Sequence, residues 1–298
     1  MNAIWKFSRP HTVIGSVISI ITLYCIICEN KLTSHIPLLV IALCIGVCTN
    51  VFIVGVNQIA DVDIDRINKP GLPIPSGEIR IEQAGLIVAL CMATSLGLSM
   101  YVSHWLFYIV FLAILIGWAY SMPPLHLKKS HVTAALAIVF VRGILINIGA
   151  FMVFNHLVNK TVFLPAHVIF LSVFITVFSV AIAWFKDLTD VKGDAVYGIK
   201  TMPLVYSVKR VFIAGNILVV VAYVLTMVFS SVELNYSISL RPVVLLVGHG
   251  VLLLLYVLNV ASTNIRSARS LRTFYKRFWL FFFAEYLLYL VVYTLLLK

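Results

Sequence analysis

Long uninterrupted apolar runs are the feature that most restricts what this chain can fold into. The runs are 16 to 23 residues long, and a helix of about 20 residues crosses a bilayer core of roughly 30 Å. Lipid offers the backbone no hydrogen-bond partner, so such segments must be helices or strands of a closed barrel. The runs lack the period-two alternation of barrel strands. The chain is therefore predicted to be an all-α polytopic membrane bundle.

The composition agrees with this prediction, and the number of apolar runs gives the number of transmembrane helices. Of the 298 residues, 62% are hydrophobic and 11% are charged, whereas a soluble domain has about 25% charged residues. Nine transmembrane helices are predicted, at 10–28, 36–58, 84–102, 105–120, 133–154, 168–185, 211–229, 243–260 and 278–297. We expect the whole chain, 1–298, to form a single membrane domain.

The positive charges are unevenly divided between the two ends of these spans. Of the 22 lysines and arginines, 17 lie on the side of the N-terminus, four lie on the other side and Arg142 lies inside a span. Positive residues collect on the cytoplasmic side of membrane proteins. The N-terminus is therefore predicted to be cytoplasmic, or stromal in a plastid. The same bias explains the net charge of +11 without a nucleic-acid partner.

The few acidic residues are concentrated in two short segments. Six of the eleven lie at 61–65 and 187–194, directly after the second and sixth predicted spans. Both segments therefore emerge on the side of the membrane that holds the N-terminus. Carboxylates this close repel one another on a helix, and an unpaired charge next to hydrocarbon is costly. The repeated arrangement favours a bound cation over two solvated acidic loops.

Helical spacing selects the candidate ligands in each segment. In a continuing helix, Asn57, Asp61 and Asp65 recur every four residues and share a face. Asp63 falls on the other side of that helix. The second segment supplies the corresponding set Asp187, Asp190 and Asp194. All of these ligands offer oxygen, which favours Mg²⁺, Ca²⁺ or Mn²⁺ over zinc. Because Mg²⁺ typically combines one or two carboxylates with waters and substrate phosphates, the two segments predict a Mg²⁺–diphosphate site.

The two motifs resemble those of the UbiA superfamily of intramembrane prenyltransferases. That superfamily has an N-x-x-x-D-x-x-x-D motif, matched at 57–65, and a D-x-x-D-x-x-x-D motif, matched at 187–194. The resemblance covers essentially the whole chain, including the nine spans. It implies a helical bundle around a central cavity that binds Mg²⁺ and a prenyl diphosphate.

Further segments are similar to the homogentisate phytyltransferase branch of this superfamily. They lie at 5–12, 57–78, 119–128, 141–147 and 274–287. This resemblance implies transfer of a phytyl or geranylgeranyl group to homogentisate, with loss of the carboxyl group, in tocopherol and prenylquinone synthesis. Other members of the superfamily use 4-hydroxybenzoate, dihydroxynaphthoate or chlorophyllide, and these acceptors remain alternatives.

Cations near the two motifs are expected to neutralise the diphosphate and its leaving group. The expected catalytic residues are Asp61, Asp65, Asp190, Asp194, Lys186 and Lys128. The expected diphosphate-binding residues are Arg66, Lys69, Tyr120, Lys128, Lys129 and Lys186. The alternative to diphosphate binding for Lys69 and Lys129 is that they are part of the ordinary positive charge at the cytoplasmic face. Several members of the superfamily have a Tyr-x-x-x-Lys element, but Tyr120 and Lys128 are eight positions apart, so the lysine that pairs with Tyr120 stays open.

Three other residues are candidates for contact with the aromatic acid, namely Arg9, Arg142 and Asn147. Arg142 lies within the fifth predicted span, where a charge is costly and often functional. It is expected to line the central cavity and to contact either the anionic aromatic acid or the diphosphate. The alternative is an ion pair with Glu285, another intramembrane charge. For Asn147 the alternative is hydrogen bonding between packed helices.

Two other classes of membrane protein fit the sequence less well. A cation transporter would carry its acidic residues near the bilayer midplane on broken helices, whereas these acids lie at span ends beside lysines. A phospholipid-headgroup transferase would carry a D-G-x-x-A-R pattern, which this sequence lacks. The predicted function is therefore prenyl transfer, with Mg²⁺ as cofactor, a prenyl diphosphate and an aromatic acid as substrates, and the bilayer as surroundings.

Overall fold

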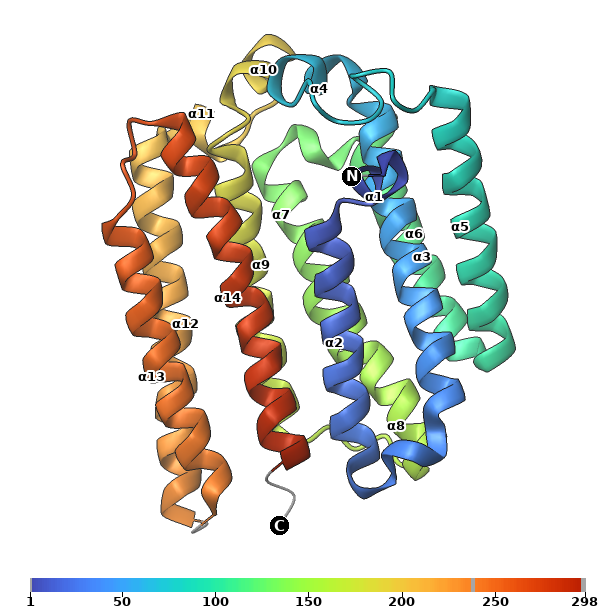
Figure 1. The fold of residues 1–298 in the computed structure, drawn as a ribbon, viewed down its shortest axis with the longest axis vertical. Helices are drawn as coiled ribbons and strands as arrows, with labels where there is room; N and C mark the ends of the chain where they lie inside the picture. Colours follow the sequence, from blue (N-terminus) through green and yellow to red (C-terminus); the bar gives the residue numbers. More distant parts are fainter. Residues whose placement is uncertain (1, 237–238, 296–298) are drawn as a thin grey trace.

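The computed structural model describes residues 2–236 and 239–295, which form a bundle of long, roughly parallel helices (Figure 1). Nine helices within these residues are long and apolar enough to cross a membrane. The described residues contain no strand. The predicted all-α bundle of nine spans is therefore confirmed. The predicted end of the ninth span, at 297, lies outside the described residues.

Most spans are single helices, and the fifth is composite. The first five are α2 (Pro10–Cys28), α3 (Ile36–Ala60), α5 (Ile81–Val102), α6 (His104–Ser121), and the run of α7 (His131–Val139), η3 (Phe140–Ala150) and α8 (Phe151–Asn159). The last four are α9 (Ala166–Asp187), α12 (Val208–Tyr236), α13 (Leu240–Ala261) and α14 (Ala268–Leu295). The segment η3 is a π-helix.

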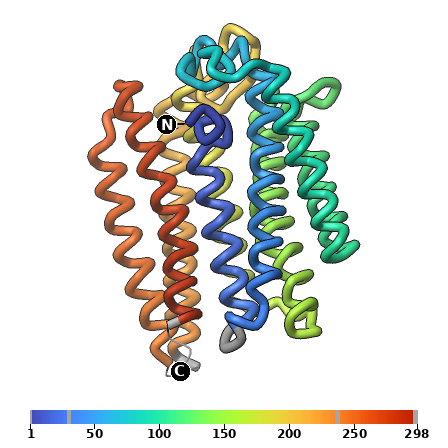
Figure 2. The backbone as a smooth tube through the Cα atoms, turned by 45° about the vertical axis from the view of Figure 1, so that its right-hand side comes forward, coloured from blue at the N-terminus to red at the C-terminus, as the bar shows by residue number. Residues whose placement is uncertain are grey.

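Short helices gather at one end of the bundle, which is also the end of the N-terminus (Figure 2). They are α1 (Ala3–Phe7), α4 (Val62–Asn68), η2 (Leu127–Lys129), α10 (Val191–Val196) and α11 (Met202–Tyr206). A further short helix, η1 (Glu29–His35), joins α2 to α3 at the other end. The C-terminal end of α14 also lies at that opposite end, as an odd number of spans requires (Figure 1).

The last span begins ten residues earlier than the sequence predicts. Its first turns contain exposed cations, which depress the hydropathy and conceal the helix. They are Arg269, Arg272, Lys276 and Arg277. The opposite face carries Leu271, Phe274 and Phe278, which are buried and recur every three or four residues. Long cationic side chains can keep their apolar stems buried while their charged ends reach a polar surface. The first turns of α14 therefore suit the headgroup region, and the rest of the helix crosses the apolar core of the bilayer.

Two clusters of buried apolar side chains hold the bundle together. The larger one joins α9, α12, α13 and α14, and in it the rings of Phe178 and Phe278 stack with centroids 4.2 Å apart. The smaller one joins α3, α5 and α6 around Phe52, Val88 and Leu106. Helices in lipid associate through such close packing and through hydrogen bonds between helices. Helix α2 and the fifth span also belong to the larger cluster, through Leu23, Ile26 and Phe151.

Each acidic motif contains a sharp turn where a continuous helix was predicted. Helix α3 stops at Asp61 (φ −103°, ψ 13°) and the chain turns into α4. Helix α9 likewise stops before Asp190 (φ −104°, ψ 2°), where the chain turns into α10. A straight continuation would carry the acids away from the bundle. The turns instead lay α4 and α10 side by side across its end, in contact with each other (Figure 1).

Candidate active site

A polar pocket of about 40 Å³ lies between the two motifs. Helices α3 and α4 supply one wall, and α9 and α10 supply the facing wall. All the predicted metal ligands line it, namely Asn57, Asp61, Asp65, Asp187, Asp190 and Asp194. Four predicted diphosphate-binding residues line it as well, namely Lys69, Tyr120, Lys128 and Lys186. The two motifs, more than 120 residues apart in the sequence, therefore line one pocket.

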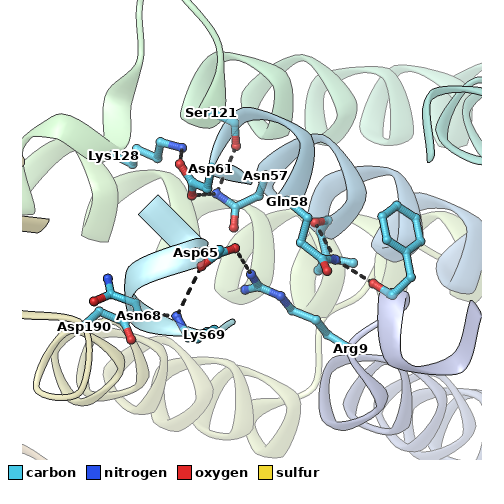
Figure 3. Close-up of polar contacts among 12 residues, drawn as sticks. Arg9, Asn57, Gln58, Asp61, Asp65, Asn68, Lys69, Ser121, Lys128 and Asp190 are labelled. Carbon is cyan, nitrogen blue, oxygen red and sulfur yellow. Dashed lines mark hydrogen bonds and ion pairs between the residues drawn. The ribbon is translucent and has the colours of Figure 1, made fainter. Parts of the chain in front are cut away.

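Lys69 connects the two motifs through one ammonium group. Its Nζ lies 2.5 Å from Asp190 Oδ2 and 3.9 Å from Asp65 Oδ1 (Figure 3). A carboxylate from each motif thus shares a single positive charge. One small cation is therefore within reach of both motifs.

Lys128 enters the pocket from the loop that follows α6. Its ammonium donates a hydrogen bond to Asp61 Oδ1, and Asn57 Nδ2 donates to Asp61 Oδ2 at 2.8 Å (Figure 3). A short β-bridge fixes this loop, because Lys200 N donates to Lys129 O at 3.0 Å and His131 N donates to Lys200 O at 3.2 Å. Lys200 belongs to the segment that follows the second motif. The bridge therefore uses that segment to hold Lys128 against Asp61 of the first motif.

Positive charge compensates the buried carboxylates of this pocket unequally. Asp65 and Asp190 are each 4% exposed. Burial raises the pKa of Asp65 although Lys69 and Arg9 lie nearby. Burial and the neighbouring Asp190 raise the pKa of Asp194 to about 6. Burial acts in the same direction on Asp190, but Lys69 and Lys186 hold its pKa below the usual value. A further cation would stabilise the ionised forms of Asp65 and Asp194.

The pocket fits a magnesium ion that is shared with a diphosphate. Its candidate ligands are all oxygens, and Asp65 Oδ2 is buried without a hydrogen-bond partner. Across the part of the chain that the structure describes, no group of three or more Asp, Glu, His or Cys side chains is arranged to hold a metal alone. Mg²⁺ needs only one or two carboxylates where phosphates and waters complete its octahedron. This arrangement therefore suits a metal that binds together with its substrate.

A larger cavity of about 270 Å³ continues from the polar pocket into the bundle. Arg9, Asn57, Tyr120 and Lys186 line both spaces and form the boundary between them. Beyond this boundary the walls are mostly apolar and come chiefly from α2, α3, α6 and the fifth span. The predicted central cavity is thus present. A ligand with an anionic head and an apolar chain matches the two spaces.

Arg142 lines this cavity, but it does not pair with Glu285. Its guanidinium carbon lies 5.2 Å from the ring centroid of Trp279 and 5.5 Å from that of Phe282, within the range of cation–π attraction. Glu285 instead meets His249, with 3.0 Å between Oε1 and Nε2 and both side chains fully buried. Arg142 Nη1 is buried and has no hydrogen-bond partner. This leaves Arg142 a donor for an anion in the cavity.

Asn147 is buried and does not line the cavity where substrate contact was predicted. Its Nδ2 donates to Arg142 O, five residues earlier, at 2.7 Å. Its Oδ1 accepts from Tyr286 Oη on α14 at 2.8 Å. The five-residue spacing matches the wide turn of the π-helix η3. Asn147 therefore fixes the backbone that carries Arg142 and joins it to α14.

Two predicted diphosphate contacts, Arg66 and Lys129, do not reach the pocket. Arg66 lies on the outer face of α4 and pairs with Asp63 at 2.7 Å, with both side chains more than 60% exposed. Lys129 is exposed, because η2 turns its neighbour Lys128 inward. Arg9, in contrast, lines both cavities, and its Nη2 lies 3.9 Å from Asp65 Oδ2.

Comparison with known proteins identifies the family of this bundle. The model of the UbiA prenyltransferase family matches residues 18–284. The chain belongs to the UbiA prenyltransferase family. It is therefore an integral membrane prenyltransferase, as the two motifs predicted, and the transporter alternative is excluded.

Relatives and solved structures place the chain within the UbiA family. It is 38% identical over 294 residues to the homogentisate phytyltransferase of Synechocystis sp.. The alignment covers 97% of this chain and 94% of the relative. It is 32% identical over 299 residues to the chloroplastic homogentisate solanesyltransferase of Arabidopsis thaliana, covering 97% and 76%. A UbiA homologue from Archaeoglobus fulgidus, solved with GPP and Mg²⁺, has a TM-score of 0.63 at 16% identity, covering 95% and 99%. The resemblance to the homogentisate phytyltransferase branch is confirmed.

Residues outside the predicted set connect the two halves of the site in this UbiA enzyme. Asn68 Oδ1 accepts from Gly193 N at 2.8 Å, which ties α4 to α10. A side chain at position 193 would displace the Asn68 amide, because its Cβ would lie 2.6 Å from Asn68 Nδ2. Gln58 is fully buried, and its Nε2 donates to Phe7 O at 2.6 Å (Figure 3). This bond ties the end of α1 to α3, two residues before Arg9. The φ of Arg9 is 52°, which is unusual for a residue other than glycine.

Asn68→Ala is expected to lower kcat/KM for prenyl transfer about 10- to 100-fold, because a shift of about 1 Å between reacting groups has effects of this size. The substitution removes two hydrogen bonds between Asn68 and α10, one with Gly193 N and one with Asp194 Oδ1, but it removes no charge. Steady-state kinetics on the purified enzyme measures the effect. Ile67→Ala, on the exposed side of the same helix, is the matched control and should retain normal activity. Equal activities of the two variants would contradict the role of Asn68.

Proposed function

We propose that this enzyme transfers a phytyl or geranylgeranyl group from its diphosphate to homogentisate in tocopherol or prenylquinone synthesis. The observation that carries the proposal is the polar, acid-lined pocket that continues into an apolar cavity across Arg9, Tyr120 and Lys186. The relatives at 38% and 32% identity are named for homogentisate as acceptor. Their names differ in the prenyl group, phytyl or solanesyl, so kinship alone leaves chain length open.

Six residues would hold Mg²⁺ and the diphosphate it accompanies. Asp61, Asp65, Asp190 and Asp194 are the principal ligands, and Asn57 and Asp187 complete the set. The related archaeal structure is described as bound to GPP and Mg²⁺, which supports this choice of ion. When bound, Mg²⁺ supplies positive charge that stabilises the departing diphosphate.

The cations of the pocket complete the neutralisation of the diphosphate. Lys69, Lys128 and Lys186 line the pocket from three segments, and Arg9 lies at its boundary with the cavity. Charged donors fixed at the place where negative charge develops lower the barrier to bond cleavage. The prenyl carbon–oxygen bond is therefore expected to break at this boundary, with its electron pair leaving on the diphosphate.

Arg142 is the proposed anchor of the aromatic acid. Its unpaired Nη1 and its place on the cavity wall suit the carboxylate of homogentisate. The electron-rich ring then attacks the allylic carbon, and a ring carbon–prenyl bond replaces the broken carbon–oxygen bond. The carboxyl group leaves as CO₂, a proton takes its place on the side-chain carbon, and the ring gives up one proton.

The orientation in the membrane follows from the charge bias. We place the N-terminus, α4 and α10 on the cytoplasmic side, or on the stromal side in a plastid, because 17 of the 22 cations lie on that side. The polar acceptor then arrives from the aqueous phase, whereas the prenyl chain enters from lipid. Residues 1–298 act in this arrangement as a single domain.

An assay of the purified protein tests the proposed function. It combines Mg²⁺, each of phytyl, geranylgeranyl and solanesyl diphosphates, and each of homogentisate, 4-hydroxybenzoate and dihydroxynaphthoate. We expect the highest kcat/KM with homogentisate and a phytyl or geranylgeranyl donor, and loss of turnover with EDTA. Preference for another acceptor would refute the homogentisate assignment, and folded protein without any product would refute the proposed function.

A further inference from the structure

We propose that His11 is the acid–base residue of the reaction. Its imidazole takes the proton that the aromatic ring gives up and returns it to the side-chain carbon when CO₂ leaves. The inference rests on the proposed function, because it takes homogentisate as the acceptor and Arg142 as the anchor of its carboxylate. It adds the residue that moves the proton.

His11 lies in the first turn of α2, and its side chain lines the central cavity. The imidazole packs edge to face against the indole of Trp279 on α14, with ring centroids 4.8 Å apart and 64° between the ring planes. No described residue forms a hydrogen bond with either nitrogen of the imidazole. Packing thus holds the ring, and its nitrogens stay open to a ligand in the cavity.

His11 is the one group that can accept a proton near neutral pH among the described residues of the cavity wall. That wall contains no aspartate, glutamate or cysteine within the part of the chain that the structure describes. Its arginines and Lys186 are already charged, and its phenols keep their protons at neutral pH. Histidine, in contrast, can gain and lose a proton in this range. The cavity therefore offers one candidate for proton transfer.

Positive charge surrounds His11. Arg9 and Arg142 line the same cavity and act on the imidazole electrostatically, as does Lys69 of α4. The positive end of the α2 dipole lies at the same turn. Like charges repel, so the imidazole among these cations is neutral in the resting enzyme, as a base must be. The same repulsion favours return of the proton once the imidazole has accepted it.

His11 and Arg142 contact the same indole. The guanidinium carbon of Arg142 lies 5.2 Å from the ring centroid of Trp279, against which His11 also packs. In homogentisate a single methylene carbon joins the carboxylate to the aromatic ring. A carboxylate bound at Arg142 therefore brings both the methylene carbon and the ring next to Trp279, where His11 is in reach of both.

The proton balance of the reaction closes on His11. Prenyl attack leaves one ring carbon that carries both the prenyl group and a hydrogen. When this carbon–hydrogen bond breaks, its electron pair restores the aromatic ring and the neutral imidazole takes the proton. When the bond to the carboxyl group breaks, CO₂ departs and the electron pair stays with the side-chain carbon, which the imidazolium then protonates. His11 ends neutral, so the cycle needs no other acid or base.

His11→Gln tests the proposal, because glutamine is polar and similar in size but cannot accept a proton. The kcat with homogentisate is expected to fall about 100- to 10,000-fold, the usual contribution of general acid–base catalysis. KM for homogentisate and calorimetric affinity for geranylgeranyl diphosphate with Mg²⁺ should stay within about threefold, since an interaction made only in the transition state affects the chemical step. A kcat within about threefold of the unchanged enzyme would overturn the proposal and assign the proton to the departing diphosphate or to an aspartate of the motifs.

His11→Ala gives a second test, which separates proton transfer from a role in the fold. The substitution leaves room for a five-membered ring beside Trp279. Added imidazole is expected to raise kcat of this variant at least about tenfold, a part of the 100- to 10,000-fold loss. Pyrazole has the same size but is a far weaker base, so it should leave kcat low. Equal effects of imidazole and pyrazole would show that the ring only fills space and would overturn the proposal.

His104→Gln is the matched control. His104 is exposed at the end of α6 that is remote from the motifs and lines none of the described cavities, so this variant should keep its kcat. The unchanged enzyme separates this inference from the proposed function, because absence of product from homogentisate would refute the acceptor assignment alone. Any other aromatic acceptor also gives up a ring proton, and the comparison of kcat between His11→Gln and the unchanged enzyme then decides the role of His11.

Discussion

Asp65→Asn and Asp190→Asn are each expected to lower kcat for prenyl transfer about 100- to 1,000-fold, the range seen when one fixed electrostatic contact to a transition state is removed. Each change keeps the size of the side chain but removes a negative charge from one motif. Lys69 lies between the two carboxylates, so the loss of either also leaves its charge poorly balanced. Single-turnover kinetics with prenyl diphosphate and acceptor measures the effect on the chemical step.

Asp63→Asn is the matched control for these two variants. Asp63 belongs to the same acidic segment, but it pairs with Arg66 on the exposed face of α4. Surface ion pairs contribute little to stability, so this variant should fold and turn over normally. A loss of activity in Asp63→Asn equal to that in Asp65→Asn would mean that the acidic segment acts through its overall charge and not through a defined pocket.

Arg142→Met is expected to raise KM for homogentisate about 100-fold and to leave KM for the prenyl diphosphate within about threefold. Removing one member of a buried charge pair typically costs 2–5 kcal/mol, or roughly 30- to 4,000-fold in affinity. Methionine fills the space between Trp279 and Phe282 with an apolar chain. Steady-state kinetics with each substrate varied in turn separates the two KM values.

Arg142→Lys keeps the charge but loses the planar fork that binds a carboxylate through two parallel bonds. It should therefore give a KM for homogentisate between those of the unchanged enzyme and Arg142→Met. The assignment of Arg142 to the acceptor would be wrong if Arg142→Met instead raised KM for the diphosphate. That outcome would place the diphosphate deeper in the bundle than the acidic motifs.

The acidic motifs were predictable because the spacing of their residues and the scarcity of acidic residues elsewhere both indicate them. Asp61 and Asp65 follow one span and Asp190 and Asp194 follow another on the same side, so charge bias alone brings them to one face. The turns at Asp61 and Asp190 were not predictable, since helical periodicity continues through both. The contact between Asn68 and Gly193 depends on those turns. No feature of either residue in isolation indicated it.

The errors among the cations have a common physical cause. Hydropathy and charge counts tell which end of a span a residue occupies, but not which way its helix is rotated. Arg66 and Lys69 are three residues apart, yet one faces solvent and the other faces the pocket. Arg142 and Glu285 are both intramembrane charges, but α14 turns Glu285 toward His249. These differences arise from packing between helices, which a single sequence does not specify.

Calorimetric binding of geranylgeranyl diphosphate, with and without Mg²⁺, tests the central claim that both acidic motifs form one metal–diphosphate site. The unchanged enzyme should bind the diphosphate tightly only when Mg²⁺ is present. Asp65→Asn and Asp190→Asn, one from each motif, should both weaken this Mg²⁺-dependent binding by about 100-fold, as expected when a charged hydrogen-bonding partner is lost. Normal binding by either variant, or binding that EDTA leaves unchanged, would contradict a single site built from both motifs.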